Sequence, residues 1–150
     1  MNDNDKAKII KLLEPFEIVE SQINISETEE LITIIIDIDE LSAGRLIGRF
    51  ASTLDSLQLI ISLMLNQGEV HKHVLLDVAG YRERRLSTLG TMVENAKNQA
   101  QQSGLPCPLP PLSATERRQI HLMLKDDAEF TSYSEGFGQD RRLYIATNTL

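Results

Sequence analysis

Residues 44–58 read GRLIGRFASTLDSLQ, and this stretch decides how the first half of the chain folds. A short helical pattern over residues 42–47 stops near Gly48, and a second one begins near Ser52. Ser52 and Asp55 have the spacing of a capping box, with Asp in place of the usual Glu. We therefore predict two helices joined by a tight glycine turn. Backbone N–H groups at such a turn can bind phosphate, although spacing alone favours a plain helix–turn–helix corner.

Alternating hydrophobic residues predict β-strands on both sides of this turn. The clearest strand covers residues 31–39, where isoleucine recurs at every second position on one face. Residues 16–26 predict a strand, with a bulge or break near residues 20–22, that pairs with it in an antiparallel hairpin, and residues 73–78 predict a third strand. A helix is expected over residues 5–13, before the hairpin. The first half of the chain therefore has the order α-β-β-α-α-β.

The second half has the order α-β-α-β-β. A long amphipathic helix is predicted over residues 80–103, followed by a proline-rich edge strand or strap over residues 105–112. Ser113 and Glu116 form a second capping box, which starts a further helix. Two strand-like segments joined by a glycine-containing turn complete the pattern, at residues 130–134 and 143–146.

Each half places helices against one face of a small sheet, so the predicted fold class is α+β. We predict two domains, one at residues 1–79 and one at residues 80–150 that includes the linking helix over residues 80–103. The single cysteine, Cys107, cannot form an internal disulfide, which favours the reducing cytoplasm. No apolar run approaches the ~20 residues of a membrane-spanning helix, so we expect no membrane insertion.

The formal net charge of −7 is unevenly distributed. Residues 1–40 carry 11 acidic and 3 basic residues, whereas the rest of the chain is nearly neutral. Basic residues in that neutral part are mostly arginines, which suit phosphate and base recognition. Solvated ends of helices and strands are the alternative explanation. The arginines occur in four groups: Arg45 and Arg49; Arg82, Arg84 and Arg85; Arg117 and Arg118; Arg141 and Arg142.

The first half resembles a type II KH domain. The resemblance rests on the element order and on the loop Gly48-Arg49-Phe50-Ala51. In that family a GxxG loop clamps the backbone of about four nucleotides, which implies contacts from Gly48, Arg49, Phe50 and the flanking Arg45. Ala51 replaces the final glycine, and its Cβ stands where backbone should approach phosphate. We therefore expect this half to bind RNA weakly or to act partly as a scaffold.

The second half resembles the R-x-x-x-H (R-three-H) domain, which binds single-stranded nucleic acid. Arg117 and His121 are four residues apart on the capped helix and share one face, although such pairs also occur by chance. The resemblance implies that both hold the strand, with Arg118 beside them. Arg142, in the closing hairpin, matches a further family position. The linking segment adds Arg84 and Arg85, for which a nucleic-acid contact and a solvated helix start are equally supported.

Taken together, residues 16–146 are similar to the Jag family, also called the SpoIIIJ-associated or KhpB family. The resemblance implies a protein that binds single-stranded RNA, and we expect it to be cytoplasmic. We expect phosphate contacts to supply most of the affinity, with low sequence specificity because the chain has only seven aromatic residues. Single-stranded DNA remains an alternative ligand, and homo-oligomers remain open. The runner-up is an interaction module whose KH-like half docks a partner, for which the resemblance implies a small KH-domain protein.

We expect no catalytic centre, cofactor or metal site, because the chain carries no P-loop, dinucleotide fingerprint, nucleophile elbow or zinc-ligand motif. His71 and His73 could hold a metal with Cys107, but no ligand set supports it. A hydrolase that uses His121 with Asp126 or Asp127 is the least favoured alternative.

Overall fold

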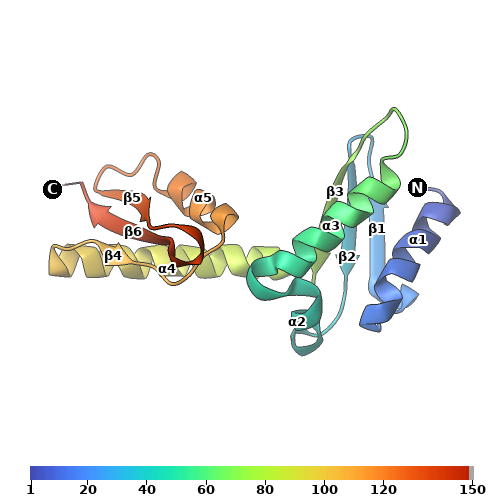
Figure 1. Ribbon diagram of the computed structural model, residues 1–150, viewed down its shortest axis with the longest axis horizontal. Coiled ribbons are helices and arrows are strands. Elements are labelled where there is room, and N and C mark those ends of the chain that lie inside the picture. Colours follow the sequence, from blue (N-terminus) through green and yellow to red (C-terminus); the bar gives the residue numbers. More distant parts are fainter. Residues whose placement is uncertain (149–150) are drawn as a thin grey trace. The chain divides into compact units, whose positions relative to one another are not determined.

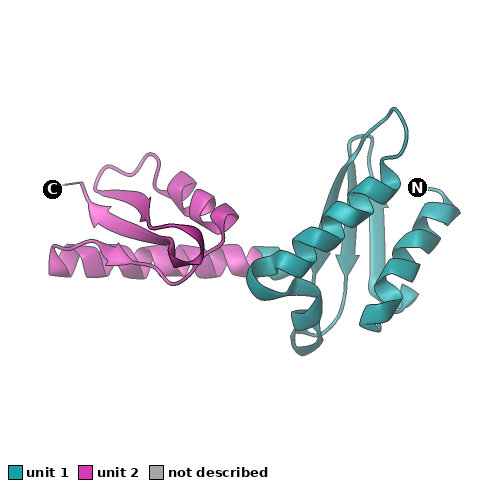
Figure 2. Cartoon of the chain, viewed as in Figure 1, with its two compact units in different colours: residues 1–82 teal, residues 83–150 magenta. Residues whose placement is uncertain are grey.

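The computed structural model describes residues 1–148 and divides the chain into two compact units, Met1–Arg82 and Glu83–Leu150 (Figures 1 and 2). Each unit combines helices with a three-stranded sheet, which confirms the α+β class. The last two residues of the predicted second domain, 149 and 150, lie outside the described residues.

Unit 1 is built on a mixed sheet with the strand order β1-β2-β3. β1 (Ile23–Glu27) pairs antiparallel with β2 (Leu31–Ile36), which confirms the predicted hairpin. β3 (His73–Val78) pairs parallel with β2. The predicted strand over residues 16–26 was too long, because short 3-10 helices precede Ile23; one of them covers residues 20–22, where a bulge or break was predicted.

Those 3-10 helices are η1 (Glu14–Phe16) and η2 (Glu20–Gln22). Glu17 ends η1 in a left-handed conformation with φ 65°, which turns the chain away from an extended path. The Gln22 side chain accepts the Val19 N–H at 3.0 Å and so stabilises the turn of η2. Local hydrogen bonding and the left-handed residue therefore shorten the strand.

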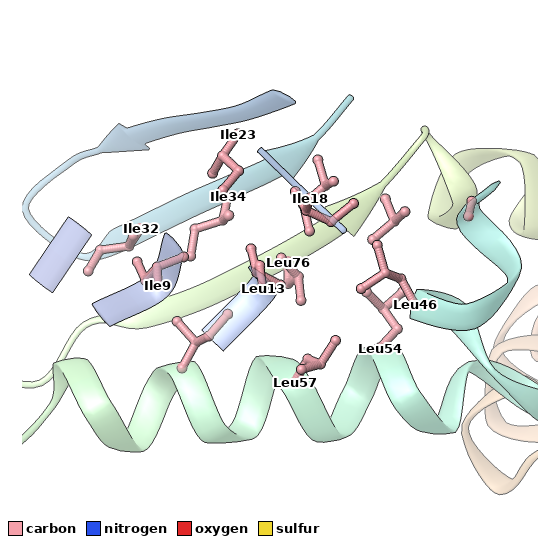
Figure 3. Close-up of a cluster of buried hydrophobic side chains, with 14 residues drawn as sticks. Ile9, Leu13, Ile18, Ile23, Ile32, Ile34, Leu46, Leu54, Leu57 and Leu76 are labelled. Atoms are coloured by element: carbon pink, nitrogen blue, oxygen red, sulfur yellow. The ribbon is translucent and has the colours of Figure 1, made fainter. Parts of the chain in front are cut away.

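Three helices cover one face of this sheet: α1 (Asp3–Leu13), α2 (Glu40–Ile47) and α3 (Ser52–Leu65). Figure 3 shows Leu54 and Leu57 of α3 pointing toward the strands. The buried cluster also includes Ile34 of the central strand β2 and Leu76 of β3, both fully buried. Alternate residues of β2 thus face the core, as the isoleucine pattern predicts. Burying each such side chain contributes about 1.5–3 kcal/mol.

Unit 2 has an antiparallel sheet with the strand order β4-β6-β5. β4 is the short edge strand Cys107–Pro108, which confirms the proline-rich edge strand of the sequence analysis. β5 (Phe130–Glu135) and β6 (Arg142–Thr147) form the closing hairpin, with η4 (Gly138–Asp140) in the turn. The sheet therefore has β6 at its centre and β5 at one edge.

Two helices cover one face of this sheet, α4 (Tyr81–Ser103) and α5 (Ala114–Met123) (Figure 1). The buried cluster joins Leu89 and Val93 of α4 and Ile120 of α5 to Leu143 and Ile145 of β6. Each of these five side chains is at most 3% exposed. The core of unit 2 therefore lies between the helices and one face of the sheet.

The N-terminus of α5 is held by a reciprocal capping box, as predicted. The Ser113 hydroxyl accepts the Glu116 N–H at 3.1 Å, and Glu116 Oε2 accepts the Ser113 N–H at 2.8 Å. Glu116 also accepts a bond from Arg85 Nε on α4 at 2.6 Å. Burial by itself would raise the pKa of Glu116, but the bonds from Arg85 and Ser113 outweigh it and lower that pKa. One buried carboxylate thus caps α5 and ties it to α4.

Within residues 1–148, no single helix is long and apolar enough to cross a membrane. One pair of helices, Glu40–Ile47 and Arg49–Leu65, is together long and apolar enough to do so by length and composition only, with a bend of 46° between the two.

Candidate nucleic-acid interface

Arg117 and His121 lie one turn apart on α5, and both are half-buried. Arg117 Nη1 donates a 2.7 Å hydrogen bond to the carbonyl of Leu112, just before the helix begins. This bond fixes the guanidinium at the start of α5 and leaves several of its five N–H donors available for other acceptors. Arg118, the next residue, is exposed.

The His121 ring contacts two serine hydroxyls of β5. Its Nδ1 lies 2.7 Å from Ser132 Oγ, and its Nε2 lies 3.4 Å from Ser134 Oγ. The two serines are two positions apart on one strand, so they point to the same face of the sheet. The imidazole is therefore oriented by hydroxyl groups rather than by a carboxylate.

These side chains form a cluster of hydrogen-bond donors at the junction of α5 and β5. We call Arg117, His121, Ser132 and Ser134 the α5–β5 cluster, and Arg118 is not part of it because consecutive residues of a helix do not share a face. Guanidinium N–H groups fit phosphate oxygens in a planar fork, and hydroxyl groups can add single bonds. The cluster can therefore bind an anion such as a nucleotide phosphate.

Asp127 has other partners than His121. Its carboxylate accepts the backbone N–H groups of Glu129 and Phe130 at 2.9 and 3.0 Å, and lies 2.8 Å from Lys97 Nζ. The bond from Lys97 is the main reason that the pKa of Asp127 is lowered, and the backbone bonds add to it. Asp127 thus closes the loop before β5, and Asp126 is exposed. The geometry gives no support to a histidine–carboxylate pair at His121.

Arg142 lies on the other face of the sheet from the α5–β5 cluster. It pairs with Glu135 across the hairpin, whereas Ser134 pairs with the buried Leu143. Directly paired residues share a face, and neighbours along a strand alternate. Alternation along a strand does not say which of its two faces the helices cover. The structure therefore does not bring Arg142 together with Arg117 and His121.

Ser132 and Ser134 were not recognised as candidate residues in the sequence. Phe130, Ser132 and Ser134 share one face of β5, so two polar residues stand where the pattern of a core-facing strand asks for apolar ones. That break in the alternation was the sequence signal that could have marked Ser132 and Ser134 as candidate functional residues. Its meaning depends on the packing of α5 against β5, which the sequence pattern does not give.

In unit 1, the glycine turn has an unusual backbone. Gly48 has φ 70°, and a Cβ there would overlap the hydroxyl of Thr53 and lie 2.9 Å from its Cβ. Phe50 and Ala51 are left-handed as well, with φ 54° and 60°. These three residues belong to a turn that includes η3 (Arg49–Ala51) and leads straight into α3. Gly48 is therefore required by its surroundings as well as by its conformation.

The predicted capping box at Ser52 and Asp55 was wrong. The N-cap of α3 is Ala51, whose side chain cannot accept a hydrogen bond, and Ser52 is already helical. Asp55 instead lies 3.4 Å from Arg82 Nη2. The left-handed turn places the helix start one residue earlier than the spacing indicated. No side chain of the cap residue therefore satisfies the first N–H groups of α3.

The arginines beside this turn lie at the surface. Arg49 stacks over the Phe50 ring, with 5.0 Å between the guanidinium carbon and the ring centroid, and Phe50 is 38% exposed. Arg45 forms an exposed ion pair of 2.7 Å with Glu17. Arg49 and Phe50 are thus in contact, and Arg45 is held toward η1.

The two linker arginines, Arg84 and Arg85, lie in the first turns of α4 within unit 2. Arg84 is exposed, and its carbonyl accepts the Thr88 hydroxyl. The side chain of Arg85 is 27% exposed and donates to Glu116. Arg85 therefore has a clear structural task in positioning α5, the helix that carries Arg117 and His121.

Comparison with known proteins bears on the family to which this chain belongs. The family model of the R-three-H domain matches residues 87–147. The chain is 34% identical over 129 residues to the RNA-binding protein KhpB of Clostridium symbiosum, which covers 85% of this chain and 57% of that protein. It is 33% identical to the RNA-binding protein KhpB of Lactiplantibacillus plantarum over 112 residues, covering 74% of this chain and 35% of that protein.

The RNA-binding protein KhpB of Bacillus subtilis is 32% identical over 108 residues, covering 69% of this chain and 51% of that protein. The chain thus spans between about a third and somewhat more than half of the length of these relatives. The matched region of the first relative extends well beyond the R-three-H domain, because it covers 85% of the chain. This chain therefore belongs to the KhpB (Jag) family and carries an R-three-H domain in its second unit.

Proposed function

We propose that this chain is a non-enzymatic, cytoplasmic RNA-binding protein that holds single-stranded RNA through the α5–β5 cluster. The observation that carries the proposal is the fixed placement of Arg117 and His121 one turn apart, beside the hydroxyls of Ser132 and Ser134. The names of its relatives and the R-three-H match support the same ligand class.

The chemistry of the cluster favours contacts with phosphate. Arginine can bind two phosphate oxygens in parallel, and the bond from Arg117 to Leu112 holds the guanidinium in place before ligand arrives. Hydrogen bonds to phosphates position a strand but carry no sequence information. We therefore propose low sequence specificity at this cluster.

The turn of unit 1 offers a second, weaker grip. Gly48 lets the turn pack closely against Thr53, and Arg49 with Phe50 places a cation and an exposed ring at the surface of that turn. The Cβ of Ala51, at the N-cap of α3, leaves less room for a phosphate beside the first N–H groups of that helix. We propose that unit 1 contributes less affinity than unit 2 for this reason.

A salt titration of binding to labelled single-stranded RNA tests the proposal. For single strands, the slope of log K against log salt is about −0.7 for each phosphate contact. Replacing Arg117 and His121 with Gln should lower the affinity at least about ten-fold and flatten that slope. Arg141→Gln is the matched control, because Arg141 is exposed and its loss changes the net charge equally.

Circular dichroism of each variant shows whether unit 2 still folds. Duplex RNA and single-stranded DNA, titrated in parallel, report the class of nucleic acid. Unchanged affinity and slope in the folded double variant would refute the assignment of the cluster.

A second candidate function is protein docking by unit 1, and the surface of α3 favours it. Leu59, Ile60 and Leu63 lie on one face of that helix and are 60%, 42% and 65% exposed. Exposed apolar residues grouped on one face are typical of interaction sites. The candidate partner is a small KH-domain protein. A complex that tolerates high salt and is lost in Leu63→Lys, but not in Leu105→Lys, would favour this function.

A further inference from the structure

The sheet of unit 2 has one face without helices among the described residues. α4 and α5 cover the face that carries Leu143 and Ile145 (Figure 1). The opposite face is formed by the residues that alternate with these two. Its members across the three strands are Thr131, Tyr133, Glu135, Arg142, Tyr144, Pro108 and the buried Ala146.

A row of rings crosses this open face. Tyr133 of β5 pairs directly with Tyr144 of β6, and Tyr144 pairs with Pro108 of β4. The two tyrosine rings are stacked, with centroids 5.4 Å apart and planes inclined by 11°. Each ring therefore covers one face of the other.

Tyr133 is the outer member of this row. β5 is the edge strand of the described sheet, so no strand in residues 1–148 pairs with its outer side. The ring face of Tyr133 that does not touch Tyr144 lies toward that edge, and the residue is 36% exposed. A flat aromatic group could therefore extend the stack on Tyr133.

A positive charge stands on the same face, beside the rings. Arg142 is two residues from Tyr144 along β6 and diagonal to Tyr133, within the reach of a long side chain. Its guanidinium donates to the carbonyl of Gln139 in the turn at 3.2 Å. Glu135, its cross-strand neighbour, is exposed. A stacking ring and a guanidinium at this spacing match a nucleobase and its adjoining phosphate.

We propose that the open face of the unit 2 sheet binds one nucleobase of a single-stranded RNA, stacked on Tyr133, with Arg142 at a neighbouring phosphate. This inference rests on the proposed RNA binding but concerns a different surface from the α5–β5 cluster. The two surfaces are linked by β5, because Ser132 and Ser134 point to one side of that strand and Tyr133 to the other. A single strand that passes around this edge can touch both.

The nucleobase is favoured over a protein segment by the composition of the face. The face offers parallel aromatic rings flanked by charged residues, without the cluster of exposed aliphatic side chains that α3 presents. Stacking on an aromatic ring accepts any base, because every base has a π-face. The proposed contact therefore adds affinity without adding strong sequence preference.

The test compares a short oligouridylate with an abasic strand of equal length and charge. Tyr133→Leu should weaken oligouridylate binding by about five-fold or more, the typical effect of losing one base–aromatic stack. Tyr133→Phe keeps the ring and should retain the affinity of the unmodified protein within about two-fold. Phe137→Leu is the matched control, because Phe137 is 93% exposed in the turn and outside the stack.

The abasic strand separates stacking from phosphate binding. It should bind the unmodified protein and Tyr133→Leu equally, because no base is present to stack. Tyrosine fluorescence gives a second readout, since the chain has three tyrosines and no tryptophan. Oligouridylate should quench this fluorescence in the unmodified protein and much less in Tyr133→Leu.

The outcomes distinguish this inference from the proposed function. If oligouridylate binds with a steep salt dependence but Tyr133→Leu binds as tightly as the unmodified protein, the stacking site is refuted and the phosphate cluster stands. If Tyr133→Leu weakens binding while the Arg117 and His121 variant does not, the stacking site stands and the cluster is refuted. Equal losses in Tyr133→Leu and Phe137→Leu overturn the stacking site, and no binding at low salt overturns both proposals.

Discussion

Ala51→Gly should stabilise unit 1, although glycine usually destabilises a folded chain. Ala51 has φ 60° and ψ 20°, a left-handed conformation that costs an L-residue roughly 1–2 kcal/mol. Glycine removes that cost but makes the unfolded chain more flexible, which takes back about 0.4–1 kcal/mol. The net gain in the free energy of unfolding should therefore be about 0.5–1 kcal/mol. For a unit of this size, the unfolding midpoint would rise by about 2–8 °C.

The assay is thermal and urea unfolding of the full chain, followed by circular dichroism and by hydrogen exchange of amides in α3. The matched control is Ala7→Gly, which makes the same chemical change at an exposed position inside α1. There the backbone is right-handed, so the substitution should destabilise unit 1 by about 1 kcal/mol. The two substitutions should thus have opposite signs.

If Ala51→Gly destabilises unit 1 as Ala7→Gly does, the left-handed turn is not the dominant conformation and the reasoning fails.

The Ala51→Gly variant also reports on function, because glycine restores the last position of the GxxG pattern. Removal of the Cβ should raise the contribution of unit 1 to RNA affinity, measured in the background of the Arg117 and His121 variant.

Three further predictions concern stability. Gly48→Ala should destabilise unit 1 by at least about 1–2 kcal/mol in urea unfolding, because its Cβ would overlap Thr53 and its φ is 70°; a neutral result would contradict the close approach. Glu116→Ala should destabilise unit 2 by about 2 kcal/mol in the same assay, because it removes the carboxylate that accepts the Ser113 N–H in the capping box and the bond from Arg85 of α4. A loss below about 0.5 kcal/mol, the usual range for a surface substitution, would argue against a buried role for Glu116. The folded pKa of Asp127 lies below its ordinary value of 3.8, so its contribution is present above that pH and is lost as pH falls through the folded pKa. Acid unfolding of unit 2 should therefore shift to higher pH in Lys97→Met, and an unchanged midpoint would dismiss this pair.

Much of the fold could be predicted because local signals and packing agree. The isoleucines of β2 alternate without interruption, and the capping box of Ser113 and Glu116 starts α5 where the pattern places it. The N-terminus of α3 was missed because Ala51 takes a left-handed conformation that favours glycine. Alanine rarely adopts this conformation, so an alanine in the sequence does not indicate a left-handed turn. The length of β1 was missed for a similar reason, the left-handed Glu17.

The candidate site was predictable only in part. The spacing of Arg117 and His121 fixes their common face of α5, because four residues make about one helical turn. The partners of His121 depend on how α5 packs against β5, and the stacking of Tyr133 on Tyr144 depends on the hairpin register. Alternation separates two faces of a strand but does not say which one is covered. For this reason Arg142 was grouped with residues from which the sheet separates it.

The hairpin register also limits how this family member can change in length. Gly136 has φ 90°, and a Cβ there would lie 3.0 Å from the carbonyl oxygen of Asp140, so the turn between β5 and β6 is closely fitted. One residue inserted within β5 would reverse its alternation and exchange Ser134 for Tyr133 at the helix-covered face. A change in the length of the loop at residues 66–72 would not reverse the alternation of any strand, because this loop joins α3 to the start of β3. Insertions and deletions should therefore be rare in the closing hairpin and common in that loop. Differences in length among family members should then show that β5 must keep its serines on one face and Tyr133 on the other.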